Sequence, residues 1–391
     1  MANNTNSVTL TVNGLNYGGW KSISISAGLE RLARDFTLAI TWKWPGNTVQ
    51  RPPEAGQKCQ VYIGNDLVLT GYIFATPISY DGNSITLAVQ GRSLTADLVD
   101  CAAITQDGKQ GQWRQQELRQ IVRELCNPYG ITVIDETELA ERKKQAIQVA
   151  QLATGTASPQ QQKKKQDTLA DHTIEPGETV FESINRLLSI YRQFATDDGH
   201  GRLIIAKVAS GGYASTELVL GKNILNASTE LDFSETYSEY RVLGQTSKTT
   251  NINGKAEDPR APRKRVLIIQ QNGQIDNKKA EDRANWEASH RMGKALETNY
   301  TVNGWRQGTG QLWLPNTIVR VRDELIDFDR DMLIMEVTYS LDEGGMLTHL
   351  RVAPPEAALP KPNKPKKRAK VKGTDGFEYL IPADYQPPKD E

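Results

Sequence analysis

The stretch DDGHGRLII, which begins at residue 197, contains residue types that could do chemistry. Two adjacent carboxylates, Asp197 and Asp198, stand close to His200. Carboxylates and an imidazole can act together as general acid and base, and they can also hold a metal ion. The sequence therefore first raises the question of an enzymatic or metal site.

The same residues are also typical of a polar turn. Gly199 and Gly201 allow positive φ, and aspartate side chains accept hydrogen bonds from the N–H groups of a turn. The preceding segment predicts a helix that ends at Phe194, and RLIIAK predicts a strand. We favour a turn between the two, with His200 facing solvent; a metal site and catalysis are the alternatives.

Elsewhere the sequence lacks the spacings of common catalytic and metal sites. It contains no HExxH, GxSxG or GxxxxGK[ST] motif and no zinc-finger spacing. The histidines are His172, His200, His290 and His349, and the cysteines are Cys59, Cys101 and Cys126. A glycosidase pair could be drawn from the 47 acidic residues, but no local pattern fixes the separation of two carboxyls. We therefore predict no catalytic residues, no metal site and no cofactor.

The bulk composition is that of a globular protein without a charged or apolar bias. The 391 residues are enough for roughly two to four domains. The net charge is zero, which gives no long-range attraction to nucleic acid or anionic lipid. The three widely spaced cysteines indicate free thiols, and no segment approaches the roughly 18 apolar residues of a membrane span. We expect a protein made in the cytoplasm, with no membrane insertion.

The elements that must position these residues predict an α+β fold that is mainly β. Residues 1–100 alternate short β-branched and aromatic runs with glycine turns, which predicts a first β-barrel domain. Residues 101–208 predict an α/β domain with a Gln/Lys-rich mobile segment near 137–168. Within it, Thr179 and Glu182 have the T-x-x-E spacing of a helix capping box.

The second half predicts a return to strands. Residues 209–354 are expected to form a second β-barrel domain with an inserted helical segment near 250–300, followed by an extended tail over 355–391. The inserted helix has a narrow seam of small residues, for which we expect light burial: Ala280, Ala284, Ala288, Met292 and Ala295. Four tryptophans in strand contexts are expected to be buried in the core or an interface: Trp42, Trp44, Trp305 and Trp313.

The two β regions end in similar patterns. Residues 52–91 and 311–355 both run in the order proline, strand, short acidic loop, apolar strand, tight turn, strand. Chance similarity of two β-meanders is the alternative to a true repeat, because few residues are identical. We favour two related barrels that flank an α/β insert, and three such chains could form a ring that is nearly six-fold.

Several ordered motifs resemble the baseplate hub proteins of contractile-tailed bacteriophages, especially the Mu-like type, and the hub portion of type VI secretion spike proteins. An E-x-G-E-T-x-x-E-x-I helix falls on Glu175, Gly177, Glu178, Thr179, Glu182 and Ile184. A D-x-x-G-x-L strand entry falls on Asp197 or Asp198 with Gly201 and Leu203. A late W-x-P-x-x-x-V-x-V strand and a paired-glycine turn fall on Trp313, Pro315, Val319, Val321, Gly344 and Gly345.

This resemblance covers about residues 7–354 and implies a structural protein rather than an enzyme. It implies a homotrimeric ring of barrel domains with α/β domains alongside. Such a hub joins the six-fold tail tube to a three-fold membrane-piercing spike in the virion baseplate, and DNA passes through it without specific binding. The implied partners are the trimeric spike, the tail tube and other baseplate proteins.

The tail departs from the family pattern. The run KPNKPKKRAKVK, from Lys361 to Lys372, has seven basic residues and no acidic one, and acids dominate the stretch after it. A solvated, extended arm is one interpretation, because like charges repel and proline removes backbone donors. Docking on an acidic face of a neighbouring subunit or the spike is another, and nucleic-acid binding is a third. The candidate partner-binding residues are Lys364, Lys366, Lys367 and Arg368.

Three other functions are compatible with parts of the sequence. The first is a tail-associated peptidoglycan hydrolase, which needs a pair of carboxylates in a cleft. The second is the hub of a phage-like secretion system, although we expect any spike to be a separate protein, because the given sequence ends soon after the second β region. The third is a β-barrel module that binds sugar or single-stranded nucleic acid.

Overall fold

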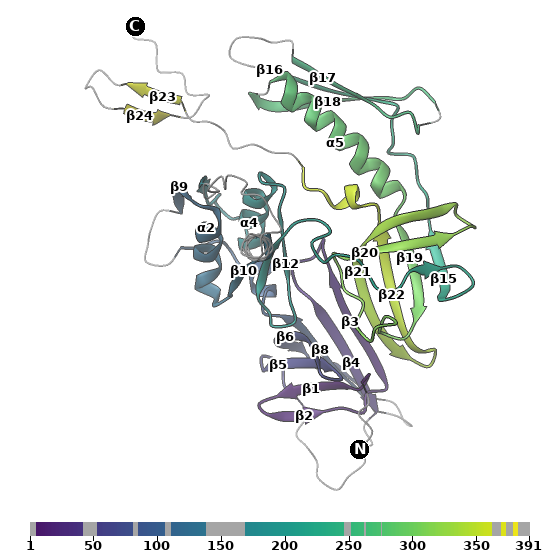
Figure 1. Cartoon of the computed structure of the whole chain (residues 1–391). Coiled ribbons are helices and arrows are strands. Elements are labelled where there is room, and N and C mark those ends of the chain that lie inside the picture. The colour runs from purple at the N-terminus through teal and green to yellow at the C-terminus, as the bar shows by residue number, and fades with distance from the viewer. Residues whose placement is uncertain are drawn as a thin grey trace, which may run out of the picture.

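A computed structural model gives the structure of the protein (Figure 1). The structure describes residues 5–41, 53–80, 85–105, 111–137, 169–245, 252–261, 263–274, 276–361, 369–372 and 378–381. Trp42, Trp44, the segment 138–168 and the candidate residues Lys364, Lys366, Lys367 and Arg368 lie outside these ranges. The fold is mainly β, as predicted. Within the described ranges no helix has the length and apolar content needed to cross a membrane.

One 14-stranded sheet dominates the molecule. Its main path runs through β15 (Ile224–Thr229), β19 (Thr298–Asn303), β22 (Gly345–Ala353), β21 (Phe328–Asp342), β3 (Ser22–Gly28), β4 (Asp35–Thr41), β8 (Ile85–Ser93), β6 (Asp66–Ala75), β5 (Lys58–Ile63), β1 (Val8–Val12) and β2 (Leu15–Tyr17). Off this path, β7 (Ile78–Tyr80) pairs with β8, β20 (Ile318–Asp323) pairs with β21, and β14 (Leu218–Val219) pairs with β20. In β1, buried residues alternate with half-buried ones, so Val8, Leu10 and Val12 place one side of that strand in the core.

Two separate closed barrels were predicted, and the structure differs. Strands β3 and β21 pair antiparallel, from Glu336 opposite Gly28 to Leu341 opposite Ile23, so the two β regions form one continuous sheet. No ladder closes either region into a barrel within the described ranges. The pairing satisfies the backbone groups that each edge would otherwise expose. The two regions also share a hydrophobic core that includes Phe36 and Trp313.

The two β regions nevertheless repeat the same strand order. The first unit is β3-β4-β8-β6-β5, and the second unit is β15-β19-β22-β21-β20. A bulge interrupts the ladder between Ile73 and Ala75 in the first unit and between Ile334 and Glu336 in the second. Each bulge precedes the hairpin turn at the same sequence distance. Matching order and matching irregularity support a true repeat, because bulges are specific features and not random defects.

A smaller α/β layer packs beside the first unit (Figure 1). It contains α1 (Ala96–Asp100), β9 (Gln112–Glu117), α2 (Leu118–Cys126), η2 (Asn127–Tyr129), β10 (Val133–Asp135), β11 (Leu169–Thr173), α4 (Val180–Ser189), β12 (Phe194–Asp197) and β13 (Leu203–Ala206). The predicted capping box is confirmed, because Glu182 N–H donates to Thr179 Oγ1 at 3.2 Å and the Glu182 carboxylate accepts from Thr179 N–H at 2.8 Å. The apolar sides of α2 and α4 are buried in one cluster.

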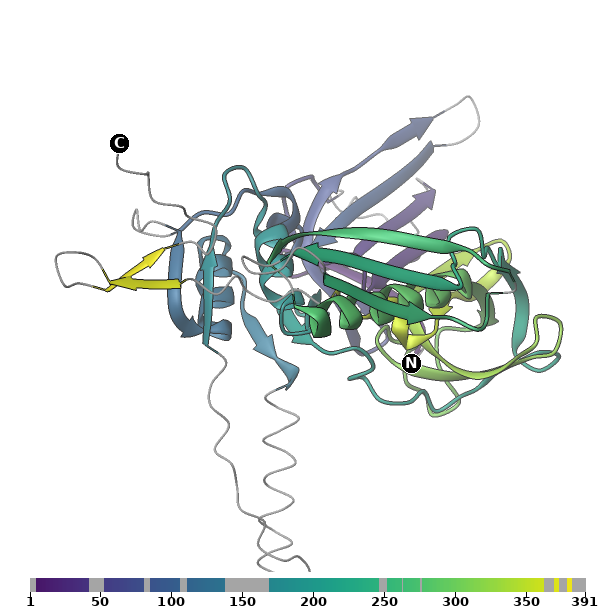
Figure 2. The same cartoon turned by 90° about the horizontal axis from the view of Figure 1, so that it is seen from above.

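A third layer is inserted in the sequence between the paired strands β15 and β19 of the second unit. Strands β16 (Glu239–Gln245), β17 (Ile252–Glu257) and β18 (Val266–Gln274) form a three-stranded sheet, and α5 (Asn277–Ala295) covers one face of it (Figures 1 and 2). The seam of small residues in α5 is buried, so the expectation of light burial was wrong. Small side chains let the helix approach closely: a Cβ on Gly254 would lie 2.1 Å from the Ala280 backbone. The chain continues through η3 (Pro355–Ala358) to β23 (Ala369–Lys372) and β24 (Glu378–Ile381).

Candidate functional site

The DDGHG stretch forms a β-hairpin turn between β12 and β13. The prediction of a turn is confirmed, but helix α4 ends at Ser189 and not at Phe194. Arg192 takes a left-handed φ of 56°, and the chain then enters β12, whose last residue is Asp197. The turn thus connects two strands rather than a helix and a strand.

Asp198 and His200 behave as a turn requires. The Asp198 carboxylate accepts hydrogen bonds from the backbone N–H groups of His200 and Arg202, both at 3.0 Å. It also accepts from Arg202 Nε at 2.7 Å. His200 is exposed, as predicted. These bonds use the carboxylate to hold the turn.

Asp197 has a different role, which the sequence did not predict. Its side chain is buried and pairs with Arg34, whose Nε lies 3.0 Å from Oδ1. Oδ2 accepts from the Arg34 backbone N–H at 3.1 Å and from Thr95 Oγ1 at 3.2 Å. Burial raises the pKa of Asp197, and the Arg34 guanidinium opposes that rise. The ion pair links the α/β layer to the first β unit.

The two glycines of the turn pack closely against strand β6. A Cβ on Gly199 would lie 2.2 Å from the Leu67 carbonyl oxygen, and Thr70 Oγ1 donates to the Gly199 carbonyl at 2.9 Å. Gly201 has a φ of 73°, and a Cβ there would lie 2.8 Å from the Thr70 carbonyl oxygen. The stretch that could have done chemistry is therefore a packed junction between two layers, with no open space around Asp197.

His172 is buried against a serine. Its Nε2 lies 2.7 Å from Ser183 Oγ, and its ring stacks on Trp113 at 5.8 Å between centroids. Burial lowers the pKa of His172 to about 4. A serine nucleophile must reach its substrate, but Ser183 is fully buried on α4. The pair therefore satisfies buried polar groups within the α/β layer.

The other two histidines are also held by their neighbours. His290 on α5 stacks on Trp286 at 4.5 Å, and burial lowers its pKa. His349 is exposed, with Nδ1 at 3.0 Å from Thr301 Oγ1 and Nε2 at 3.0 Å from Ser340 Oγ. In the described part of the chain, no three His, Cys, Asp or Glu side chains are grouped to hold a metal. The predicted burial of Trp305 and Trp313 is confirmed.

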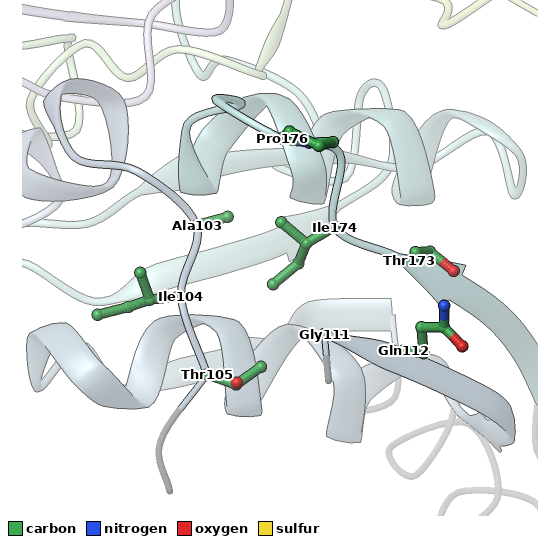
Figure 3. Close-up of a pocket in the computed structure, with 8 residues that line it drawn as sticks. All are labelled: Ala103, Ile104, Thr105, Gly111, Gln112, Thr173, Ile174 and Pro176. Atoms are coloured by element: carbon green, nitrogen blue, oxygen red, sulfur yellow. The ribbon is translucent and has the colours of Figure 1, made fainter. Parts of the chain in front are cut away.

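A cavity of about 620 Å³ lies in the α/β layer (Figure 3). Its lining comes from the chain after α1, the start of β9 and the end of β11: Ala103, Ile104, Thr105, Gly111, Gln112, Thr173, Ile174 and Pro176. None of these eight side chains titrates, so the described part of the lining offers no acid, base or charged group to a substrate. The chain between Thr105 and Gly111 lies outside the described ranges.

The comparisons with known proteins decide the family. The chain is 30% identical to the baseplate hub protein gp44 of Escherichia phage Mu over 395 residues, which cover 97% of this chain and 96% of that protein. The chain belongs to the Mu-like baseplate hub proteins. Three models of this family match: the N-terminal domain of GpP-like baseplate assembly proteins at 7–93, the gp44-like second domain at 95–158 and the GpP fourth domain at 276–361.

Solved tail proteins share the hub fold. A 43 kDa tail protein of prophage MuSo2 from Shewanella oneidensis has a TM-score of 0.75 at 32% identity, covering 91% of this chain and all of that one. A tail protein from Neisseria meningitidis has a TM-score of 0.71 at 21% identity, covering 91% and 98%. A type VI secretion component of E. coli, at 12% identity and a TM-score of 0.51, shares the fold over 92% of this chain and 81% of its own. Hub proteins are structural components of the virion tail baseplate, and the relatives' names denote no enzyme.

Proposed function

We propose that this hub forms a homotrimeric ring that joins the six-fold tail tube to a three-fold spike and leaves a passage for DNA. The observation that carries this proposal is the pair of similar β units, joined edge to edge through β3 and β21. Three chains would supply six such units. One face could then match a six-fold partner while the assembly keeps three-fold symmetry. The tube, the spike and other baseplate proteins would be its partners, and assembly would occur in the host cytoplasm.

The charge of the chain supports a passage that does not hold DNA. A ring lined with many lysines would bind phosphates through counterion release. The whole chain has 47 basic and 47 acidic residues, and the strongest basic run lies in the tail after Pro360. DNA would therefore slide through without specific binding.

The proposed domain division follows the sequence. Residues 1–100 and 209–354 would provide the two β domains, 101–208 the α/β domain, and 355–391 the tail. Lys364, Lys366, Lys367 and Arg368 would contact an acidic face of the spike or of a neighbouring subunit.

Electron microscopy of the purified chain tests the proposal. Class averages should show an annulus with three-fold symmetry and an open bore. Compact monomers at micromolar concentration, or a ring without a bore, would contradict it. A peptidoglycan zymogram provides the matching test for a hydrolase: we expect no clearing, and clearing by the pure protein would overturn the structural role.

A further inference from the structure

Among the strands of the large sheet with only one ladder partner in the described ranges are β7 and β15, besides β2 and β14. Strand β7 forms a ladder only with β8, and β15 forms a ladder only with β19, apart from an isolated bridge between Ile224 and Leu220 at its start. Both edges expose apolar side chains: Ile78 and Tyr80 on β7 are 61% and 79% exposed, and Leu225 on β15 is 59% exposed. Figure 1 shows β15 at one end of the large sheet. A free edge with exposed apolar groups is a template for pairing with another chain.

The junction inside the chain shows how such edges can pair. There, β3 of the first unit pairs with the half of β21 that leads into the hairpin turn of the second unit. The first unit has β7 in the place of that half of β21, because β7 leads into the corresponding hairpin turn with β8. The second unit has β15 in the place of β3, because each is the outermost strand of its unit. Both sides of the junction thus recur at the outer edges of β7 and β15, where no ladder pairs them within the described ranges.

The hairpins fix which residues of β7 and β21 correspond. Tyr80 lies opposite Ile85 across one hairpin, and Leu341 lies opposite Met346 across the other. Both pairs enclose four residues, so Tyr80 takes the place of Leu341. One residue earlier, Ser79 takes the place of Ser340.

The ladders fix which residues of β15 and β3 correspond. In the first unit, Gln90 lies opposite Ala75, the residue that follows the bulge. In the second unit, Arg351 lies opposite Glu336, which follows the corresponding bulge. In line across the first unit are Gln90, Thr37 and Ser24. In line across the second unit are Arg351, Asn299 and Ser228. Ser228 therefore takes the place of Ser24, which lies opposite Ser340 within the chain.

We propose that β7 of one copy pairs antiparallel with β15 of the next, with Ser79 opposite Ser228. This inference rests on the proposed ring and names the strands that close it. The same register places Tyr80 opposite Ala227 and Ile78 opposite Thr229. In this register Ile78 takes the place of Tyr339 of β21. Tyr339 is only 3% exposed within the chain, so the contact between copies would cover Ile78 in the same way. Because the two edges differ, the contact is head-to-tail, and only closure into a ring pairs β7 and β15 of every copy.

A cysteine pair tests this register. Residues directly opposite in antiparallel strands have Cα atoms about 4.5–5.5 Å apart, which suits a disulfide. The variant is Ser79→Cys with Ser228→Cys, in a Cys101→Ser background that removes the partly exposed thiol. After mild oxidation, a denaturing gel should show a covalent trimer that reducing agent removes. Each single-cysteine variant should stay monomeric on the gel.

Two controls separate the register from the ring itself. The pair Ser24→Cys with Ser340→Cys should cross-link within one chain in any oligomeric state. The pair Ser79→Cys with Asn226→Cys moves the second thiol two residues along the same face, roughly 7–8 Å away, and should cross-link poorly. A native mass of three subunits with no Ser79–Ser228 cross-link, while the control within the chain forms, would overturn the edge pairing and leave the trimer standing. A monomeric mass would overturn both, and a covalent dimer as the largest product would overturn the ring.

Discussion

The buried ion pair between Arg34 and Asp197 is expected to hold the α/β layer on the first β unit. Asp197 is buried, and the Arg34 side chain is 13% exposed. Removing one partner of a buried pair leaves the other charge without compensation and costs about 3–5 kcal/mol. In Asp197→Ala, Arg34 would keep its hydrogen bonds to the carbonyls of Val68 and residue 197, at 3.1 and 3.0 Å. We therefore expect Asp197→Ala to lower the free energy of unfolding by about 3 kcal/mol, near the lower end of that range.

Urea unfolding of the full chain at fixed protein concentration measures this loss. The matched control is Asp35→Ala, because Asp35 also pairs with an arginine, Arg31, but both side chains are well exposed, at 39% and 46%. Exposed pairs contribute about 0.2–1 kcal/mol, so the control should be mild. Adding Arg34→Met to Asp197→Ala removes the uncompensated charge and should restore part of the stability. If Asp197→Ala costs no more than Asp35→Ala, the pair does not hold the layers together.

Three further predictions concern the same layers. Gly199→Ala should destabilise the protein by about 1–3 kcal/mol in urea, because its Cβ would meet the Leu67 carbonyl, whereas Gly18→Ala, with its nearest atom at 3.6 Å, should be tolerated. Burial lowers the pKa of His172 to about 4, so the unfolded state binds the proton first as pH falls. The free energy of unfolding should therefore drop by up to roughly 3 kcal/mol between pH 6.5 and 4. The variant His172→Gln should reduce this dependence of the free energy of unfolding on pH, and His200→Gln should not. Burial raises the pKa of Cys59 and Cys126 to about 12, so a thiol reagent at pH 8 should label the native chain quickly at Cys101 alone; rapid labelling of three thiols, read by mass spectrometry, would contradict the packing.

Local patterns in the sequence predicted the local structure. The Thr179–Glu182 capping box forms because its two partners are three residues apart, and the glycines and Asp198 form the expected turn. The same local reasoning placed Asp197 in that turn as well. Its partner Arg34 is 163 residues away in sequence, and no spacing rule brings two such residues together. The identity of a buried charge's partner depends on tertiary packing.

The arrangement of the β regions was predicted only in part. The similar sequence patterns of residues 52–91 and 311–355 correspond to a repeat in strand order and bulge position. The pairing of β3 with β21 was not predicted, because strand sequences show which side faces a core and not which edges meet. The seam of α5 was misjudged for a related reason. Small residues such as Ala280 permit close contact with the sheet, and only the sheet itself, with Gly254 opposite, shows that they are buried.

The native mass of the purified chain tests the central claim most directly. Light scattering coupled to size exclusion, over a range of protein concentrations, measures that mass independently of shape. A trimeric hub predicts three times the chain mass of 43.5 kDa, with no dependence on concentration in the micromolar range. A mass of one or two chains at the highest concentration would contradict the ring.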